Sequence, residues 1–402
     1  MKNEKYKGTL SERFAEYGVK KNRIGSSGTI WLHAVSVGEA VGAIPLIRLL
    51  QEKEVGTPVV VSTTTKGGME ILEKTFGDKI IPIYFPLDFP WVIRRALNVL
   101  KPRALILMET EIWPNLIVKS DRKGVPVMLM NGRVSDRMVS ASGIIKKLYK
   151  TVFKSIRILG MQTQKDADRI IELGANENKV HVVGNMKFDG QMSDIDSDKI
   201  NRLKDIFKPG EAGIVIAGST HPGEEEMLLD AYKSITTRNT GIRLVIAPRH
   251  IERAAEVVDI VRSKDLEPVL RSSLSEDSMI KDEVIILDTI GELRYLYSLA
   301  ELCFVGGSLI ERGGHNILEP AACGKAAFYG PYMMNFESSV NVLEENNGGI
   351  QVRNEEDIVS EFNKYLNNKE YRDSLDANAF DVVKRNAGAA DRAYRLFKEC
   401  VK

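Results

Sequence analysis

The sequence predicts an α/β protein of two domains, each a mostly parallel β-sheet with helices on both faces. Length is the first of three observations behind this prediction, because 402 residues suggest two or three domains at roughly 100–200 residues each. Secondly, apolar segments of strand length alternate with stretches of helical period, a pattern typical of βαβ units. Thirdly, this alternation breaks near residues 190–200, where Asp, Ser, Gln and Gly cluster, and then restarts.

The first half begins with an apolar segment at 29–33, followed by a helical stretch at 39–50 in which Val41, Ile44, Ile47 and Leu50 recur at helical spacing. Further strands are expected at 58–62, 80–85, 104–108, 125–130 and 181–183. Because these segments are apolar throughout, the sheet should be buried on both faces.

The second half repeats the pattern. Strands are expected at 213–217, 243–247, 284–287 and 302–305, helices at 224–235, 251–263 and 316–323, and a helical tail at 371–402. The predicted division is a domain at 1–190, a domain at 191–385, and a C-terminal helix at 386–402.

Composition excludes several classes of protein. Hydrophobic residues make up 43% and charged residues 28%, an ordinary globular balance that excludes disordered, collagenous and disulfide-stapled chains. The three cysteines are too few and too scattered for a disulfide framework, which predicts a reducing compartment. No apolar run approaches the roughly 20 residues that span a bilayer.

The charge is divided unevenly between the halves. Residues 1–190 carry 30 Lys and Arg against 19 Asp and Glu, a net of +11, whereas residues 191–402 carry 26 against 36, a net of −10. Such a difference indicates that the first half faces an anionic partner, either nucleic acid or membrane.

Ligands of open parallel sheets bind beyond the carboxyl ends of the strands, so the residues that follow each strand are the candidate site residues. In the first half these are Glu39, Glu109, Glu111 and Lys187. Glu39 suits either a simple helix start or a general base. Glu109 and Glu111 should share a side if the chain stays extended, and both could instead be solvated loop residues. Lys187 could neutralise an anion or simply lie at the surface.

In the second half the strand ends carry small and phosphate-suited groups at 218–221, 248–250, 306–309 and 312–320. Glycines before the helix at 316 should expose free backbone N–H groups to an anion. Arg249 has a planar guanidinium that is suited to phosphate, and Glu319 is placed to accept hydrogen bonds from ribose hydroxyls. The chain has neither a P-loop nor a GxGxxG fingerprint, and its five histidines lack metal-ligand spacing, so no metal and no cofactor are expected.

Three runs together resemble the 3-deoxy-D-manno-octulosonic acid (Kdo) transferases. They are residues 33–39 (HAVSVGE), 108–115 (METEIWPN), and 304–309 (FVGGSL) with 313–320 (GGHNILEP). The resemblance implies a GT-B fold, with two Rossmann-like domains whose parallel sheets face across a cleft. It also implies transfer of Kdo from CMP-Kdo to a lipid A precursor in lipopolysaccharide assembly.

The resemblance also implies roles for particular residues. Glu39 corresponds to the general base, and Glu109 and Lys187 to transition-state stabilisers. The implied CMP-binding residues are Pro248, Arg249, Ile290, Gly291, Glu292, Asn316, Ile317, Leu318 and Glu319. One base and no protein nucleophile indicate direct displacement with inversion.

The implied partners are CMP-Kdo, the lipid A precursor and an anionic membrane surface, at the cytoplasmic face of the inner membrane. Kdo transferases usually begin with an apolar anchor, and this sequence starts about where such an anchor would end. We therefore expect peripheral attachment. Its expected basis is a helical stripe and the basic start at Lys20, Lys21 and Arg23. The stripe consists of Lys146, Lys147, Lys150, Lys154 and Arg157, with Ile145, Leu148, Val152 and Ile156 on a neighbouring face.

Other functions remain open on the sequence. Another GT-B enzyme that uses a UDP-sugar, such as a 2-epimerase or a lipid A disaccharide synthase, would prefer UDP to CMP. A non-catalytic nucleotide-sugar or lipid-binding module would bind without turnover. Nucleic-acid binding is disfavoured because the basic residues lack interleaved aromatic side chains.

Overall fold

The computed structural model describes residues 9–24, 28–191, 196–207, 213–237, 239, 241–278 and 284–401. The chain divides into two compact units, Met1–Gly190 with Asn386–Lys402, and Gln191–Arg385. Residues 192–195, in the expected join between the domains, and residues 1–8 of the polar start lie outside the described residues.

The first unit is built on a seven-stranded sheet in the order β3-β2-β1-β4-β5-β6-β7, with all its neighbouring strands parallel. Its strands are β1 Thr29–His33, β2 Val59–Thr63, β3 Ile81–Tyr84, β4 Pro102–Met108, β5 Val127–Gly132, β6 Ile158–Met161 and β7 Val180–Val182. Its α-helices are α1 Leu10–Arg13, α2 Val37–Lys53, α3 Lys66–Phe76, α4 Pro90–Leu100, α5 Pro114–Arg122, α6 Asp136–Val139, α7 Gly143–Lys154, α8 Gln164–Glu172 and α17 Ala389–Cys400.

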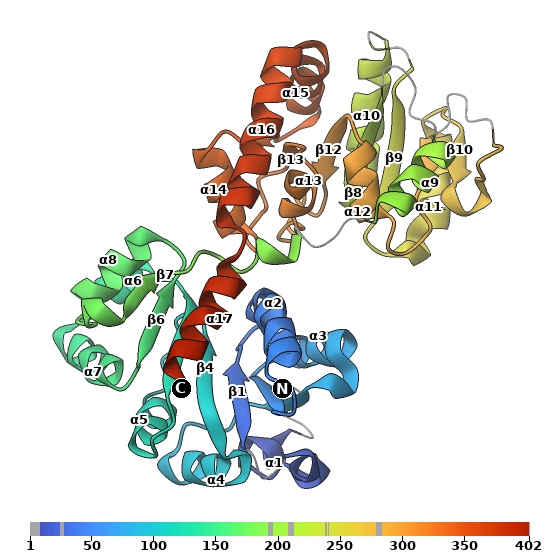
Figure 1. The fold of residues 1–402 in the computed structure, drawn as a ribbon. Coiled ribbons are helices and arrows are strands. Elements are labelled where there is room, and N and C mark those ends of the chain that lie inside the picture. The colour runs from blue at the N-terminus through green and yellow to red at the C-terminus, as the bar shows by residue number, and fades with distance from the viewer. Residues whose placement is uncertain are drawn as a thin grey trace, which may run out of the picture. The chain divides into compact units, whose positions relative to one another are not determined.

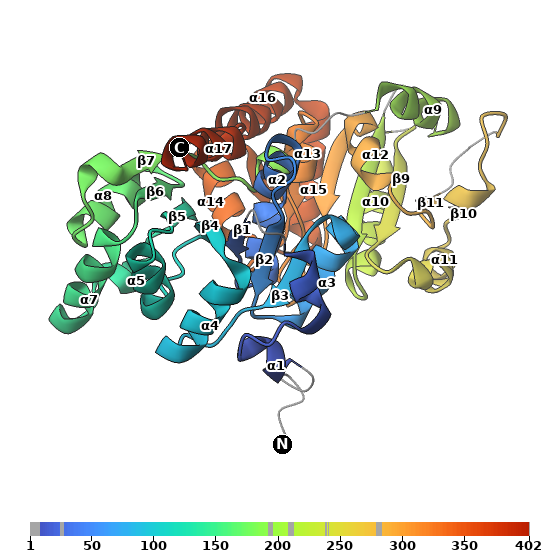
Figure 2. The ribbon, with the colours of Figure 1, turned by 60° about the horizontal axis from the view of Figure 1, so that its bottom comes forward.

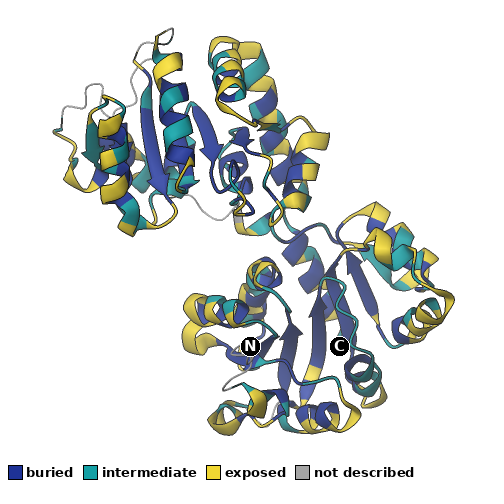
Figure 3. Ribbon diagram, turned by 180° about the vertical axis from the view of Figure 1, so that it is seen from behind, coloured by how far each residue is buried: buried dark blue, intermediate teal, exposed yellow. Residues whose placement is uncertain are grey.

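Two apolar layers cover this sheet. Residues of α4, α5 and α7 pack on one face, and residues of α2, α3 and α17 pack on the other. Figure 2 shows α4 and α5 on the side of the strands away from α2 and α17. In Figure 3 the strands are buried while the outer surfaces of the helices are exposed, the arrangement that continuous apolar strands require.

The second unit has the sheet order β10-β11-β9-β8-β12-β13-β14, again parallel throughout. Its strands are β8 Ile214–Thr220, β9 Arg243–Pro248, β10 Pro268–Leu270, β11 Val284–Ile286, β12 Leu302–Val305, β13 Ala327–Tyr329 and β14 Gly349–Gln351. Its α-helices are α9 Ser197–Phe207, α10 Glu224–Thr236, α11 Ala254–Ser263, α12 Leu293–Leu299, α13 Leu318–Ala322, α14 Glu337–Glu345, α15 Glu355–Asn367 and α16 Lys369–Asn386.

The end of the chain returns to the first unit. The helix α17 packs against α2 (Figure 1). The Asp189 carboxylate caps it by accepting from the N–H groups of Ala389 (3.1 Å) and Ala390 (2.5 Å). At its other end the buried Glu54 accepts hydrogen bonds from Tyr394 (2.8 Å) and Lys398 (2.9 Å).

Two helices differ in detail from expectation. The face of α2 that meets the sheet includes Ala40 and Ala43, whereas Val41 of the expected apolar stripe is exposed, because small residues allow closer packing of the helix on the sheet. The helix α7 ends at Lys154, so Arg157 lies outside it, in disagreement with the expected stripe.

The apolar face of α7 is also divided. Val152 is buried in the core, as is Ile156 just beyond the helix, whereas Ile145 and Leu148 are 42% and 44% exposed. The basic start is partly engaged as well. Lys20 pairs with Glu12 at 2.7 Å, and Arg23 donates to backbone carbonyls near β3.

Candidate active site

The first turn of α2 presents Glu39 directly beyond the carboxyl end of β1. Ser36 is the N-cap residue, and its hydroxyl accepts from the Glu39 N–H (3.3 Å) and donates to the Glu39 Oε1 (2.9 Å). The other carboxylate oxygen accepts from the Val35 N–H at 2.7 Å. In this variant of the capping box the carboxylate accepts from the N–H before the N-cap residue and is held in one orientation. Glu39 therefore lies in the first turn of the helix, as the simpler interpretation of the sequence proposed.

The environment of Glu39 goes beyond that of a surface helix cap. The side chain is buried, and this burial raises its pKa to about 7, with the Glu109 and Glu111 carboxylates adding to the effect and the Val35 N–H opposing it. A carboxylate with a pKa near neutrality suits general-base catalysis, because it is available in the ionised form and still holds a proton well.

Lys187 and Glu109 lie beside this turn. The Lys187 Nζ is 3.4 Å from the Glu109 Oε1, and the lysine side chain runs along α2, where a Cβ on Gly42 would approach its Cγ to 3.4 Å. Asn131 supports this segment, since its Oδ1 accepts from the Met186 N–H at 3.0 Å. The structure therefore brings together the three residues expected in the first unit.

The chain does not stay extended through Glu109 and Glu111. Glu109 has a φ of 52° and its N–H donates to the Met130 carbonyl at 2.8 Å, so the strand ends in a turn. The two carboxylates still interact, because burial and then the Glu109 charge raise the pKa of Glu111. Glu111 thus joins the cluster, although the resemblance assigns it no role of its own.

In the second unit, a buried carboxylate organises the ends of β8 and β12. Glu224 is fully buried at the start of α10, and it accepts four backbone N–H groups. The donors are His221 (3.0 Å), Gly307 (2.6 Å), Ser308 (2.9 Å) and Leu309 (2.9 Å). Sequence analysis missed this role, because three of the four donors lie more than 80 residues from Glu224 in the chain.

The glycines before the helix at 316 were expected to expose free backbone N–H groups, and for Gly314 this expectation is wrong. The N–H groups of residues 307–309 bind Glu224, and the Gly314 N–H donates to the Gly307 carbonyl at 2.7 Å. The helix expected at 316–323 is the five-residue α13, which begins only at Leu318. Because these N–H groups are engaged, the nearby side chains become candidates for anion binding.

Three histidines and several arginines supply such side chains. The Nε2 atoms of His221 and His315 are 2.9 Å apart, their rings are parallel, and the His250 ring lies edge-on to His221 with a centroid distance of 5.9 Å. Burial lowers the pKa of His221, and the positive charges of nearby residues lower it further. These neighbours are Arg312, His250, Arg253 and Arg249.

The expected CMP-binding residues divide into two groups. Pro248 ends β9, and the Arg249 N–H donates to the Thr220 carbonyl at 2.9 Å, which fixes the backbone from which its guanidinium extends. Asn316 donates to Glu319 at 3.3 Å, and Arg249 is among the charges that stabilise the Glu319 carboxylate, whose pKa burial raises. Ile317 and Leu318 are buried in the core, so only their backbone is available to a ligand.

The second group is the segment Ile290, Gly291 and Glu292. The Glu292 carboxylate pairs with Arg271 at 3.0 Å, and the Gly291 carbonyl accepts from Lys199 at 3.2 Å. Among the described residues, no hydrogen bond links this segment to Arg249 or Glu319. The structure thus places Arg249 with Glu319 and leaves the 290–292 segment tied to other partners.

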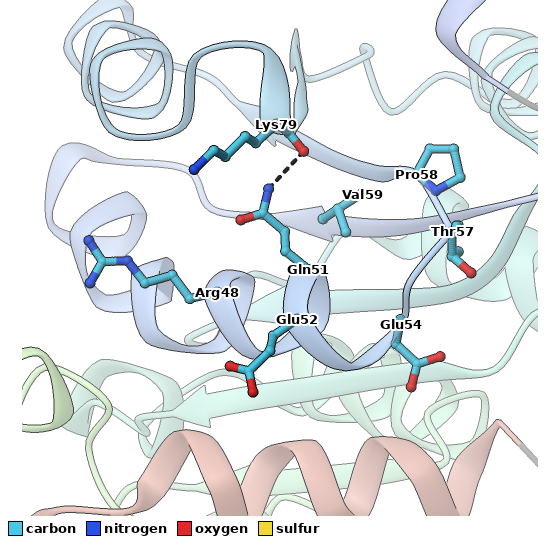
Figure 4. Close-up of a pocket in the computed structure, with 9 residues that line it drawn as sticks. Arg48, Gln51, Glu52, Glu54, Thr57, Pro58, Val59 and Lys79 are labelled. Atoms are coloured by element: carbon cyan, nitrogen blue, oxygen red, sulfur yellow. Dashed lines mark hydrogen bonds between the residues drawn. The ribbon is translucent and has the colours of Figure 1, made fainter.

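A surface pocket of about 650 Å³ lies at the opposite end of α2 from Glu39. Figure 4 shows its lining, including Arg48, Gln51 and Lys79, with Gln51 donating to the Lys79 carbonyl. It contains none of the expected site residues. Within the described parts of the chain, no cluster of three or more metal-ligating side chains occurs, and no helix is long and apolar enough to cross a bilayer.

The fold defines the protein as a member of the GT-B class. The UDP-GlcNAc 2-epimerase from Neisseria meningitidis has the same fold, with a TM-score of 0.59 and 12% identity over 92% of this chain and 100% of that one. A glycosyltransferase from Rickettsia africae gives a TM-score of 0.56 and 14% identity over 93% and 99%.

Sequence comparison identifies the family within this class. The family described as 3-deoxy-D-manno-octulosonic-acid transferase (kdotransferase) matches residues 8–190. The transferase of Haemophilus influenzae is 34% identical over 99% of this chain and 92% of its own length, and that of Aquifex aeolicus is 30% identical over 85% and 87%. The chain therefore belongs to the 3-deoxy-D-manno-octulosonic acid transferase family, which confirms the resemblance seen in the motifs.

Proposed function

We propose that this protein transfers Kdo from CMP-Kdo to a lipid A precursor, with inversion and with Glu39 as the general base. The observation that carries this proposal is the buried Glu39 carboxylate, with a pKa of about 7, beside Lys187 and Glu109 at the carboxyl end of the sheet. Membership of the Kdo transferase family supports Kdo as the transferred sugar, and the cluster of Glu39, Glu109 and Lys187 supports a base-assisted transfer.

In the proposed reaction an acceptor hydroxyl attacks the anomeric carbon of Kdo. Glu39 takes the hydroxyl proton, the new C–O bond forms, and the bond from the anomeric carbon to the phosphate oxygen breaks. CMP then leaves as an anion. A positioned base of this kind contributes typically 10²–10⁴-fold to the rate. Lys187 offers positive charge to the developing transition state, and Glu109 holds the lysine in place through their 3.4 Å ion pair.

Donor binding is assigned to the second unit. Arg249 and the other cations around His221 supply the positive charge that CMP requires, and Glu319 is placed to accept hydrogen bonds from ribose. The remaining proposed contacts are Pro248, the backbone of 316–318 and the 290–292 segment. Glu292 would have to leave Arg271 if its carboxylate is to contact CMP.

We further propose that the first unit binds an anionic membrane surface at the cytoplasmic face of the inner membrane. The helix α7 exposes Ile144 (83%), Ile145 and Leu148, and it carries the α7 lysines, Lys146, Lys147, Lys150 and Lys154. Exposed apolar side chains next to lysines favour the headgroup layer of a bilayer, where each basic residue contributes about 1 kcal/mol.

The decisive experiment incubates the protein with CMP-Kdo and a tetraacylated lipid A precursor and measures the product by mass. Addition of Kdo supports the proposal, and binding without a mass change would favour a non-catalytic module instead. The second enzyme candidate, a UDP-sugar enzyme, has the fold of the Neisseria epimerase in its favour. Tighter binding of UDP than of CMP in a titration would select it.

A further inference from the structure

His221, directly after β8, and His315, in the loop between β12 and α13, are held at hydrogen-bonding distance, although they lie 94 residues apart in the chain. The His221 Nε2 and the His315 Nε2 are 2.9 Å apart, and the ring planes are parallel with centroids 5.2 Å apart. A neutral imidazole donates from one nitrogen and accepts at the other, so this contact requires one shared proton. If both Nε2 atoms carried protons, two donors would face each other.

The backbone around the pair is fixed. Glu224 accepts from the N–H groups of both His221 and Gly307, and the Gly314 N–H donates to the Gly307 carbonyl. Gly307 has a φ of 67°, and a Cβ there would lie 2.9 Å from the His315 Cδ2 and 3.4 Å from the His221 Cδ2. The rings therefore lie over a glycine that leaves room for them.

The charged surroundings of the pair are mostly positive. From β9 and the following turn come Arg249, His250 and Arg253, and Arg312 follows β12. The nearby carboxylates are already engaged: Glu224 binds backbone N–H groups, and Glu225 pairs with Arg253 at 2.8 Å. Both histidines are only half-buried, so a ligand can reach them.

We propose that His221 and His315 form an oxyanion-binding pair that takes up one proton when the anion binds. The anion replaces the N···N hydrogen bond with two N–H donors, one from each ring, and its negative charge stabilises the second proton. The proton comes from solvent, and no covalent bond changes. This inference rests on the proposed function, since the oxyanion would be the phosphate of CMP or the carboxylate of Kdo.

Burial and the nearby cations keep both rings neutral without a ligand, with one proton between the two Nε2 atoms, and they lower the pKa of His315 to about 4. Anion binding raises the pKa of the pair, so the affinity should be greatest at low pH and should fall as pH rises through the pKa of the complex. Between pH 7 and 8.5 a phosphate monoester, with a second pKa of about 6, keeps a nearly constant charge. A fall in affinity over this range therefore reflects the titration of the protein and not that of the ligand.

The test uses the full chain labelled with ¹⁵N at its five histidines, whose ring signals show which nitrogens are protonated. Its arms are CMP, cytidine, inorganic phosphate and Kdo, each with affinity measured by calorimetry at pH 7 and 8.5. We expect CMP and phosphate, but not cytidine, to leave a proton on the Nε2 atom of both His221 and His315, so that one of the two rings becomes an imidazolium. If Kdo is the only ligand that protonates both Nε2 atoms, the pair binds the carboxylate of Kdo.

The His315→Gln variant keeps a polar side chain but cannot be charged. We expect its affinity for CMP to fall about tenfold at pH 7 and to lose its pH dependence. His181→Gln, in β7 of the first unit, is the matched control and should change neither. If CMP binds normally while both rings stay neutral, the inference fails and the proposed function stands. If inorganic phosphate protonates the pair but CMP does not bind, the oxyanion site stands and the nucleotide assignment fails. If no arm changes the rings, the inference is overturned.

Discussion

Replacing Glu39 by Gln should abolish transfer and at the same time stabilise the protein above neutral pH. A general base cannot be replaced by an amide, so the rate of transfer should fall by about 10²–10⁴-fold. The fold should tolerate the change, because Gln also completes a capping box. Its amide oxygen can accept from the Val35 N–H while its amide group donates to the Ser36 hydroxyl.

The expected gain in stability follows from the raised pKa of Glu39. The difference between about 7 and the ordinary value of 4.5 corresponds to about 3 kcal/mol at 1.36 kcal/mol per pH unit. Since the pKa is higher in the folded state, the carboxyl costs nothing below pH 4.5, and its cost grows as pH rises to about 7 and is complete above that. Gln removes this cost, and partial exposure makes 3 kcal/mol an upper bound.

The assay compares urea unfolding of the wild type and Glu39→Gln at pH 5 and pH 8, together with Kdo transfer read by mass. We expect the variant to gain stability only at pH 8, while the wild-type kcat/KM rises with pH through about 7. Glu52→Gln, an exposed position on the same helix, is the control and should change neither measurement. Near-normal transfer by Glu39→Gln would refute the assignment of the base. If the wild type and Glu39→Gln are equally stable at both pH values, the reasoning from burial is refuted.

Three further predictions concern other parts of the molecule. Replacing Arg249 or Glu319 by Ala should weaken CMP binding by about 1.5–3 kcal/mol, the range for a lost charged hydrogen bond, and unchanged calorimetric affinity would show that the nucleotide lies elsewhere. Reversing the α7 lysines to Glu should abolish the salt-sensitive part of co-sedimentation with anionic vesicles and leave CMP affinity intact; vesicle binding that persists unchanged would make α7 an ordinary solvated face. Glu224→Ala leaves four backbone N–H groups without their acceptor, so it should lower both the stability of the second unit and its affinity for CMP. Glu226→Ala is the control and should do much less. Equal effects of the two substitutions would mean that the hydrogen bonds of Glu224 to the loop are unimportant.

The sequence by itself determined the fold class and the family, and it predicted a set of site residues. Strands such as 29–33 and 302–305 are short, apolar throughout and followed by small or polar residues, and this local pattern is enough to place β1 and β12 and the groups beyond their ends. Glu39 and Lys187 could be named in advance for the same reason, because each follows a strand of a parallel sheet. Family motifs then supplied roles that spacing alone left open.

Contacts between distant segments were decided only by the tertiary structure. The pKa of Glu39 depends on burial and on carboxylates 70 residues away. Glu224 accepts from the N–H groups of residues 307–309, and His221 contacts His315 although the two lie 94 residues apart. On α7, the same helical period describes a core face and an exposed face, and only packing separates Val152 from Leu148. The periodicity of a sequence shows which residues share one face of a helix or strand. Whether that face is buried or hydrogen-bonded depends on the distant segments of the chain that pack against it.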